Sequence, residues 1–247
     1  MIEKLLTKDG TATLYSKEFN ESYHSLSDGA LKESLEKHII PAFKFSKKKD
    51  ELNILDMCFG LGYNTLSTLY YIKKNGLNIK VNIISPEFDR ELIKSLKSFE
   101  YPEEFSEFRE VIESLSSNLY YKDSQFKIEI FNEDARETIR DIDKKIDILY
   151  QDPFSPKKNP LLWTKEYFKD IKKIASEDII ITTYSVATPI RLSMSENGFR
   201  VYEYKGEGVR GSTIASLKEL NLKEIDMELK RERNPNAKPL LDRDFLS

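Results

Sequence analysis

From about residue 47 onward, the chain alternates between two patterns of apolar and polar positions. Short runs rich in apolar and β-branched residues predict strands, and longer segments with apolar residues three or four positions apart predict helices. The predicted strands are residues 52–58, 80–85, 126–131, 146–151 and 179–184. The predicted helices are residues 63–74, 90–99, 102–119, 135–141, 163–175 and 189–196. This alternation is typical of an α/β protein with a mostly parallel, doubly wound sheet.

The two ends of the chain depart from this alternation. Residues 29–43 predict an amphipathic helix that follows short polar and aromatic elements, and the lysines at 47–49 mark an exposed boundary. Near the other end, strands at residues 199–204 and 212–217 flank a glycine-rich turn, which predicts a C-terminal antiparallel hairpin at the edge of the sheet. We therefore expect three parts: an N-terminal segment and helix packed on the core (1–46), the main domain (47–220), and a C-terminal helix and tail (221–247).

Composition limits the chemistry that is available to the chain. Hydrophobic residues make up 39% of it and include 14 Phe and 13 Tyr, which is enough for a sizeable core. The formal net charge of −3 neither indicates nor excludes a nucleic-acid partner, because a local basic cleft can bind a polyanion on an acidic protein. Cys58 is the single cysteine, which excludes an internal disulfide and a cysteine-based zinc site. With only His24 and His38 besides, we expect no metal site, and we expect both histidines to be solvated or part of the core.

The sequence also gives an expectation for location. No stretch approaches the roughly 20 consecutive apolar residues of a membrane-spanning helix. Residues 1–10 carry charges and no long apolar run, unlike a signal peptide. Together with the single cysteine, this favours a reduced, cytoplasmic compartment and no membrane partner.

A glycine loop, residues 56–64, joins the first predicted strand of the main domain to its helix. Gly60 and Gly62 allow the backbone to approach a ligand without a Cβ in the way. Ligands of open α/β sheets bind at this carboxyl edge of the strands. Thr65 stands where a dinucleotide fingerprint would have its third glycine, which disfavours NAD. An ordinary tight turn remains the alternative interpretation.

Polar residues also follow the second and third predicted strands. Glu87 is placed to accept hydrogen bonds from both hydroxyls of a ribose. Glu133 and Asp134, after Asn132, can bind an adenine amino group, although Asp134 is equally suited to cap a helix. Polar groups after three successive strands predict an adenosine-bearing cofactor without a pyrophosphate, which suits S-adenosyl-L-methionine.

The loop after the fourth predicted strand begins Asp152-Pro153-Phe154 and continues through a lysine pair and further prolines to residue 160. Methyl transfer to nitrogen needs a free lone pair, and a nearby carboxylate can take the proton of an amine and hold its remaining N–H. Asp152 is placed for that role, and Phe154 can stack on a planar target group. Lys157 and Lys158 can hold a phosphate. The alternative is a proline-rich surface turn with solvated lysines.

These loops carry a family resemblance. Residues 59–64 resemble the F-G-x-G-x-N signature of the MnmC-type methyltransferase family, and residues 152–164 resemble its D-G-F-A-P-x-K-N-P-x-M-W-T signature. The similarity extends over residues 14–217, with Pro153 and Leu162 in place of the family's usual glycine and methionine. The resemblance implies a Rossmann-like methyltransferase fold and S-adenosyl-L-methionine as cofactor. It implies cofactor-binding roles for Gly60, Gly62, Asn64 and Glu87, and a catalytic role for Asp152.

The activity that this resemblance implies is methylation of a modified wobble uridine in tRNA. The expected reaction converts 5-aminomethyl(-2-thio)uridine into 5-methylaminomethyl(-2-thio)uridine, with the tRNA anticodon stem-loop as partner and Arg210 as a further phosphate contact. In many bacteria this domain is fused to an oxidase that prepares the amine, so we expect a separate oxidase or amine-forming enzyme to act upstream of this chain. A methyltransferase for another amine, in a small molecule or protein, and a non-catalytic tRNA-binding module of the same fold remain as alternatives.

Overall fold

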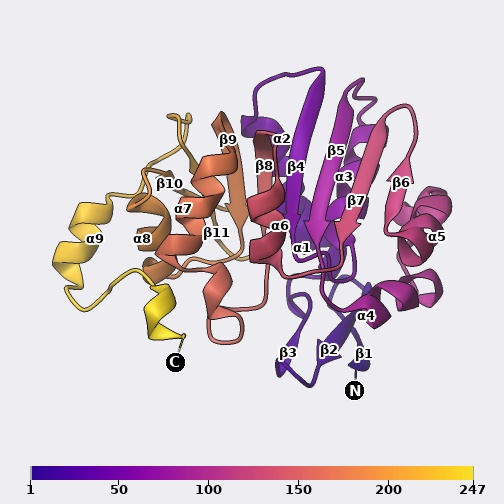
Figure 1. The fold of residues 1–247 in the computed structure, drawn as a ribbon, viewed down its shortest axis with the longest axis horizontal. Helices are drawn as coiled ribbons and strands as arrows, with labels where there is room; N and C mark the ends of the chain where they lie inside the picture. The colour runs from indigo at the N-terminus through magenta and orange to yellow at the C-terminus, as the bar shows by residue number, and fades with distance from the viewer. Residues whose placement is uncertain (1, 247) are drawn as a thin grey trace.

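The computed structural model describes residues 2–246 and is built around an eight-stranded mixed sheet (Figure 1). Its strand order is β10-β11-β9-β8-β4-β5-β7-β6, and the five strands from β9 to β7 are parallel to one another. The bounds are β4 (Glu51–Met57), β5 (Lys80–Pro86), β6 (Tyr120–Lys122), β7 (Phe126–Phe131), β8 (Ile146–Gln151), β9 (Ala175–Thr183), β10 (Arg200–Tyr204) and β11 (Ser212–Ser216). The predicted antiparallel C-terminal hairpin is confirmed as β10–β11 at one edge. The other edge is the short antiparallel strand β6, which the sequence analysis did not predict.

Helices cover both faces of this sheet, as the doubly wound pattern predicts (Figure 1). One face carries α1 (Ala30–Glu33), η1 (Ser34–Ile39), α2 (Ile40–Phe45), α3 (Tyr63–Lys74), α4 (Arg90–Ser95), η2 (Leu96–Ser98), η3 (Glu103–Phe108) and α5 (Arg109–Asn118). The other face carries α6 (Ala135–Asp141), η4 (Pro160–Leu162), α7 (Lys165–Ile174) and α8 (Thr188–Ser195). Strand β8 lies between two buried faces, and all six of its residues are buried. This explains its nearly continuous apolar sequence.

The helix expected at residues 29–43 is present but is not a regular α-helix. Its middle, Ser34–Ile39, has π-helical hydrogen bonds, a pattern that usually occurs as a single-turn bulge inside an α-helix. Pro41 follows in the first turn of α2 and has no N–H to donate to the preceding turn. The irregular stretch matters because it holds three buried polar residues, Ser34, Lys37 and His38.

A second, smaller sheet precedes the main domain. It consists of the antiparallel strands β1 (Ile2–Leu6), β2 (Ala12–Ser16) and β3 (Glu21–Ser22). Figure 1 shows it below the large sheet, next to α4 and the loops that follow the parallel strands. The Tyr63 hydroxyl donates to the Ala12 carbonyl at 2.8 Å and so ties the small sheet to the start of α3.

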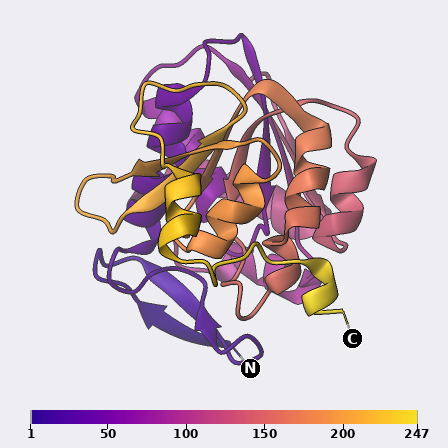
Figure 2. The same cartoon turned by 90° about the vertical axis from the view of Figure 1, so that its left-hand side faces the viewer.

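The C-terminal segment packs back on the domain after α9 (Met227–Arg233). Asp242, in η5 (Asp242–Asp244), pairs with Arg136 at 2.7 Å and accepts a hydrogen bond from the Thr164 hydroxyl at 2.6 Å. Figure 2 shows the chain passing from α9 to this contact, with both termini toward the end that holds the small sheet. Across residues 2–246, no helix is long and apolar enough to cross a membrane.

Candidate active site

A cavity of about 750 Å³ lies where the small N-terminal sheet meets the carboxyl edge of the large one. Most of its walls come from the segment 16–27, the loop after β4, and the residues that follow β5, β7 and β8, and Glu33, Tyr184 and Arg210 complete them. The four strand ends that the sequence analysis singled out therefore open into one space, as expected for strand ends on the same edge of a parallel sheet.

The glycine loop turns tightly between β4 and α3. Gly60 (φ +53°) lines the cavity, and a Cβ there would lie 3.2 Å from the Tyr23 ring. Gly62 (φ +71°) is the N-cap of α3, and a Cβ there would come within 2.8 Å of the Phe59 ring. Gly62 shapes the turn and is not among the residues that line the cavity, and its contact with a cofactor stays a prediction.

Glu87 is held rigidly beside this loop. One carboxylate oxygen accepts the Gly60 N–H at 2.9 Å, and the other accepts the Asp89 N–H at 2.9 Å. Burial raises the pKa of the Glu87 carboxyl, and these backbone hydrogen bonds oppose that rise. Each carboxylate oxygen has a second lone pair, so Glu87 can still accept hydroxyl groups of a ligand in the cavity.

The acidic pair after β7 also lies at the cavity. Asp134 caps α6 by accepting the Arg136 N–H at 2.8 Å, which is the structural role that the sequence analysis kept open. Glu133 accepts the Thr138 hydroxyl at 2.9 Å. Both carboxylates are thus partly engaged within the protein while they remain part of the cavity wall.

Asp152 lies in the loop after β8 and lines the cavity, and each of its carboxylate oxygens has a neighbouring side chain. Oδ2 accepts a hydrogen bond from Asn64 Nδ2 at 2.9 Å, and Oδ1 lies 3.5 Å from Nε2 of His38. Burial alone would raise the pKa of Asp152, but the neighbouring His38 and the hydrogen bond from the Asn64 amide lower it below the usual value. Asn64 also lines the cavity, so its contact with a cofactor stays a prediction, and in the structure its amide positions Asp152.

Sequence reasoning missed the role of His38. Its side chain is fully buried, and Nδ1 lies 3.0 Å from the Thr182 hydroxyl on β9. It is a core histidine, as one of the two expectations had it, yet it also faces the cavity residue Asp152. No local pattern signals this, because His38, Asp152 and Thr182 come from three separate elements.

Phe154 lines the cavity but does not present two free faces. Its ring stacks on Phe19 with centroids 4.6 Å apart and an interplanar angle of 21°. Tyr23 meets it edge-on at 5.0 Å. A planar target group would therefore contact an aromatic cluster from two parts of the chain, Phe19 and Tyr23 from the N-terminal segment and Phe154 from the β8 loop.

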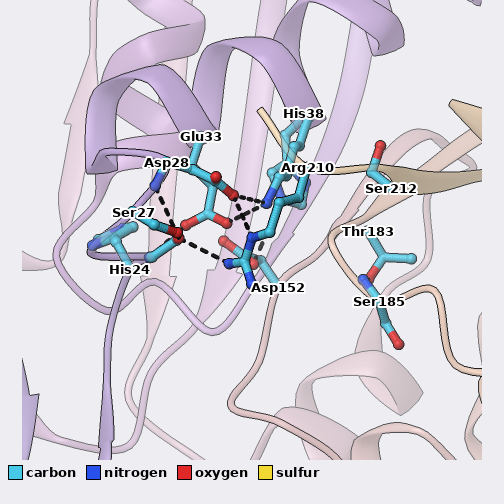
Figure 3. Close-up of polar contacts among 12 residues, drawn as sticks. His24, Ser27, Asp28, Glu33, His38, Asp152, Thr183, Ser185, Arg210 and Ser212 are labelled. Atoms are coloured by element: carbon cyan, nitrogen blue, oxygen red, sulfur yellow. Dashed lines mark hydrogen bonds and ion pairs between the residues drawn. The ribbon is translucent and has the colours of Figure 1, made fainter. Parts of the chain in front are cut away.

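The predicted basic contacts fall into two groups. Arg210 lines the cavity, where Nε bonds the Asp28 carboxylate at 3.1 Å and Nη2 donates to the Ser25 hydroxyl at 2.9 Å (Figure 3). The same Asp28 carboxylate forms an ion pair with Nζ of the buried Lys37 at 2.7 Å. Lys157 and Lys158 are exposed and lie outside the cavity wall, on the surface beside it.

Comparison with known proteins bears on this geometry. Residues 101–219 match a family model described as S-adenosyl-L-methionine-dependent methyltransferase. The crystal structure of MnmC2 from Aquifex aeolicus superposes with a TM-score of 0.86 and 33% sequence identity, covering 99% of this chain and 80% of that one. The chain belongs to the MnmC2-like family of S-adenosyl-L-methionine-dependent methyltransferases.

Two curated relatives of this MnmC2-like chain are longer proteins. An uncharacterized protein of Methanocaldococcus jannaschii is 32% identical over 94% of this chain and 60% of its own length. The tRNA 5-methylaminomethyl-2-thiouridine biosynthesis bifunctional protein MnmC of Leptospira interrogans is 27% identical over 89% of this chain. The match covers 37% of that bifunctional protein.

The methyl donor of the family fits the residues at this MnmC2-like cavity. Because Gly60 has no side chain, there is room between the glycine loop and Tyr23. The carboxylates of Glu87, Glu133 and Asp134 all line the cavity, and their predicted contacts with the ribose and adenine of the donor stay predictions. The fold expectation is confirmed as a Rossmann-like methyltransferase with a mostly parallel sheet and antiparallel C-terminal strands.

Proposed function

We propose that this chain N-methylates the aminomethyl group of 5-aminomethyl(-2-thio)uridine at the wobble position of tRNA. The observation that carries the proposal is a carboxylate, Asp152, fixed by Asn64 and aimed into a cavity that also holds an aromatic cluster. A fixed carboxylate suits an amine, and the aromatic rings suit a base, which in the anticodon loop is single-stranded and can be splayed out. The name of the Leptospira relative supports the choice of nucleoside.

Asp152 performs the central step of the proposed mechanism. Its carboxylate holds the substrate ammonium, accepts one proton from it and orients the resulting lone pair. The bound donor supplies an electrophilic methyl group: as the N–C bond forms, the C–S bond breaks and its electron pair stays on sulfur. The new secondary amine keeps its remaining two hydrogens and leaves as an ammonium, so one proton is released per turnover.

The surrounding residues position the two reactants for that displacement. In the proposal Glu87 and the Gly60 loop hold the donor, and Phe154 with Phe19 packs against the uracil ring. Much of the rate enhancement of such an in-line transfer comes from positioning. We assign phosphate contacts to Arg210, Lys157 and Lys158. We also infer that an enzyme which generates the primary amine acts before this one.

The test is methylation of defined tRNA. The protein is incubated with S-adenosyl-L-methionine and tRNA that carries 5-aminomethyl-2-thiouridine, and the wobble nucleosides are analysed by mass spectrometry. We expect one methyl group per wobble nucleoside, and Asp152→Ala should reduce turnover by at least about a hundredfold while cofactor binding persists. Methylation of a free amine but not of the tRNA would replace the proposed substrate. Cofactor and tRNA binding with no turnover in the wild type would indicate a non-catalytic module.

A further inference from the structure

His38 connects the cavity to the centre of the large sheet. It lies in the π-helical segment η1, and its Nδ1 lies 3.0 Å from the Thr182 hydroxyl on β9. Its Nε2 lies 3.5 Å from Oδ1 of Asp152, and Figure 3 labels both of these side chains. The imidazole has no exposed surface. Among the residues that the structure describes, Nε2 has no hydrogen-bond partner within standard geometry, and Asp152 is the carboxylate within ion-pair distance of it. A buried ring nitrogen whose one polar neighbour is a cavity carboxylate points to a role at that carboxylate.

The Thr182 contact fits either tautomer of His38, because the hydroxyl can donate to Nδ1 or accept from it. When Thr182 donates to Nδ1, the neutral ring carries its hydrogen on Nε2, which then faces the carboxylate. The opposite tautomer would turn the Nε2 lone pair toward a carboxylate oxygen inside a buried site, where two acceptors repel each other. The arrangement therefore favours an Nε2–H that donates to Asp152.

Asp152 is then held from two sides. Asn64 Nδ2 fixes Oδ2 and His38 fixes Oδ1, which leaves the remaining lone pairs for a ligand in the cavity. The other titratable groups around this pair come from every neighbouring element: Asp56 on β4, His24 after β3, Glu33 on α1, Tyr150 on β8 and Tyr184 after β9. His24 bonds Thr13 at 3.0 Å and has no ion pair with Asp152 among the described contacts.

We propose that His38 is a positioning residue that, together with Thr182, aims the Asp152 carboxylate into the cavity and keeps it ionised for the substrate amine. This inference rests on the proposed role of Asp152 in amine methylation. An ionised, immobile carboxylate binds an ammonium group without first reorganising, whereas a mobile or protonated one does not.

The first test leaves His38 and Asp152 unchanged and needs no substrate. The chain has two histidines, so ¹⁵N-labelled histidine gives two ring systems, and His24→Gln assigns them. We expect the neutral His38 ring to carry its hydrogen on Nε2. A hydrogen on Nδ1 would overturn the proposal.

The second test compares variants of matched length. Gln keeps an N–H donor near the place of Nε2, and Met has a similar unbranched chain without one. We expect His38→Met to raise the pKa of Asp152, followed by carboxyl ¹³C shifts, by at least about one unit, a tenfold change in proton affinity. His38→Gln should restore part of the shift, and His24→Gln should change it less than His38→Met. An unchanged Asp152 pKa in folded His38→Met would overturn the proposal.

These readouts separate the two proposals. Both spectroscopic measurements are made without donor or tRNA, so they report on the pair itself. If the wild type shows the expected tautomer and shift but does not methylate the wobble nucleoside, the proposed function fails and the positioning of Asp152 stands. If it methylates tRNA without the expected tautomer, only the role of His38 fails.

Discussion

Asn64, in the first turn of α3, donates a hydrogen bond of 2.9 Å to Oδ2 of Asp152, which lies 88 positions later in the chain. The bond joins the end of the glycine loop to the loop after β8. The two loops that we propose to hold the donor and the amine are thus linked by one amide group. Asn64 belongs to the glycine loop in the sequence, and in the structure it also donates to the Asp152 carboxylate.

Replacing this amide should affect turnover more than cofactor binding. A hydrogen bond to a charged group contributes about 1.5–3 kcal/mol, so Asn64→Leu should lower the methylation rate about 10- to 100-fold. Calorimetric affinity for S-adenosyl-L-homocysteine should change much less. Asn75→Leu is the control, because that side chain bonds the Tyr71 carbonyl at the other end of α3. A loss of cofactor affinity that matches the loss of rate would restore Asn64 as a cofactor ligand.

Substituting Gly62 or Gly76 by alanine compares two sources of lost stability, the strained backbone and the crowding by Phe59. Both have positive φ, +71° and +58°, but a Cβ meets the Phe59 ring at 2.8 Å at Gly62 and nothing within 4 Å at Gly76. Gly76→Ala should lower the free energy of unfolding by about 1–2 kcal/mol from the left-handed backbone alone. Gly62→Ala should cost about 1–3 kcal/mol more from overpacking. Equal losses in chemical denaturation would show that the Phe59 ring moves aside freely.

Asp56 should make the stability of the protein depend on pH. Burial raises its pKa from 3.8 to about 7, and the 2.7 Å hydrogen bond from the Thr65 hydroxyl only partly opposes this. The pKa of Asp56 is higher in the folded state than in the unfolded state. Its contribution to the free energy of unfolding is therefore complete below about pH 4, and it is lost as pH rises through about 7.

The variant Asp56→Asn cannot ionise and should lack this decline. Its free energy of unfolding relative to the wild type should therefore increase between pH 4 and pH 8, by an amount on the order of a few kcal/mol. Urea denaturation of both proteins across this range measures the difference. A difference that stays constant with pH would mean that Asp56 is ionised in the folded protein throughout.

Lys157 and Lys158 should contribute to RNA binding by charge. They are exposed on the same loop as Asp152 and Phe154, so a nucleic acid that enters the cavity passes close to them. The double variant Lys157→Ala/Lys158→Ala should weaken tRNA binding and reduce the slope of log affinity against log salt by about one for each phosphate that is no longer neutralised. The control is Lys144→Ala, because Lys144 is exposed just before β8, at the amino end of that strand and away from the Asp152 loop. An unchanged slope would favour a small-molecule amine as substrate.

Much of the large sheet was predictable because its strands are buried on both faces. The predicted ends of β4, β5, β7 and the nearly continuous apolar run of β8 agree with the structure within a residue or two. The positions of the cavity loops were therefore predicted correctly. Strand β9 begins at Ala175, earlier than predicted, because Ser176, Glu177 and Asp178 give no apolar signal. Its polar start is instead held by the ion pair of Asp178 with Lys49 at 3.1 Å.

The rest of the site depends on contacts that no local pattern contains. Strands β2 and β3 are short and partly polar. The sequence of the small sheet that completes the cavity therefore shows no clear alternation of apolar and polar positions. The stacking of Phe19 on Phe154 and the approach of His38 to Asp152 arise only when the N-terminal segment packs against the β8 loop. The loops were therefore found from the sequence, and their partners were not.

The contact of His38 with Thr182 spans 144 positions, which has a consequence for synthesis on the ribosome. The glycine loop, Glu87 and Asp152 all emerge before Thr182 does. A nascent chain that ends before β9 therefore contains Asn64, His38 and Asp152, but its His38 lacks the Thr182 hydroxyl that contacts Nδ1. The orientation of His38 toward Asp152 can therefore be fixed only after β9 has been made.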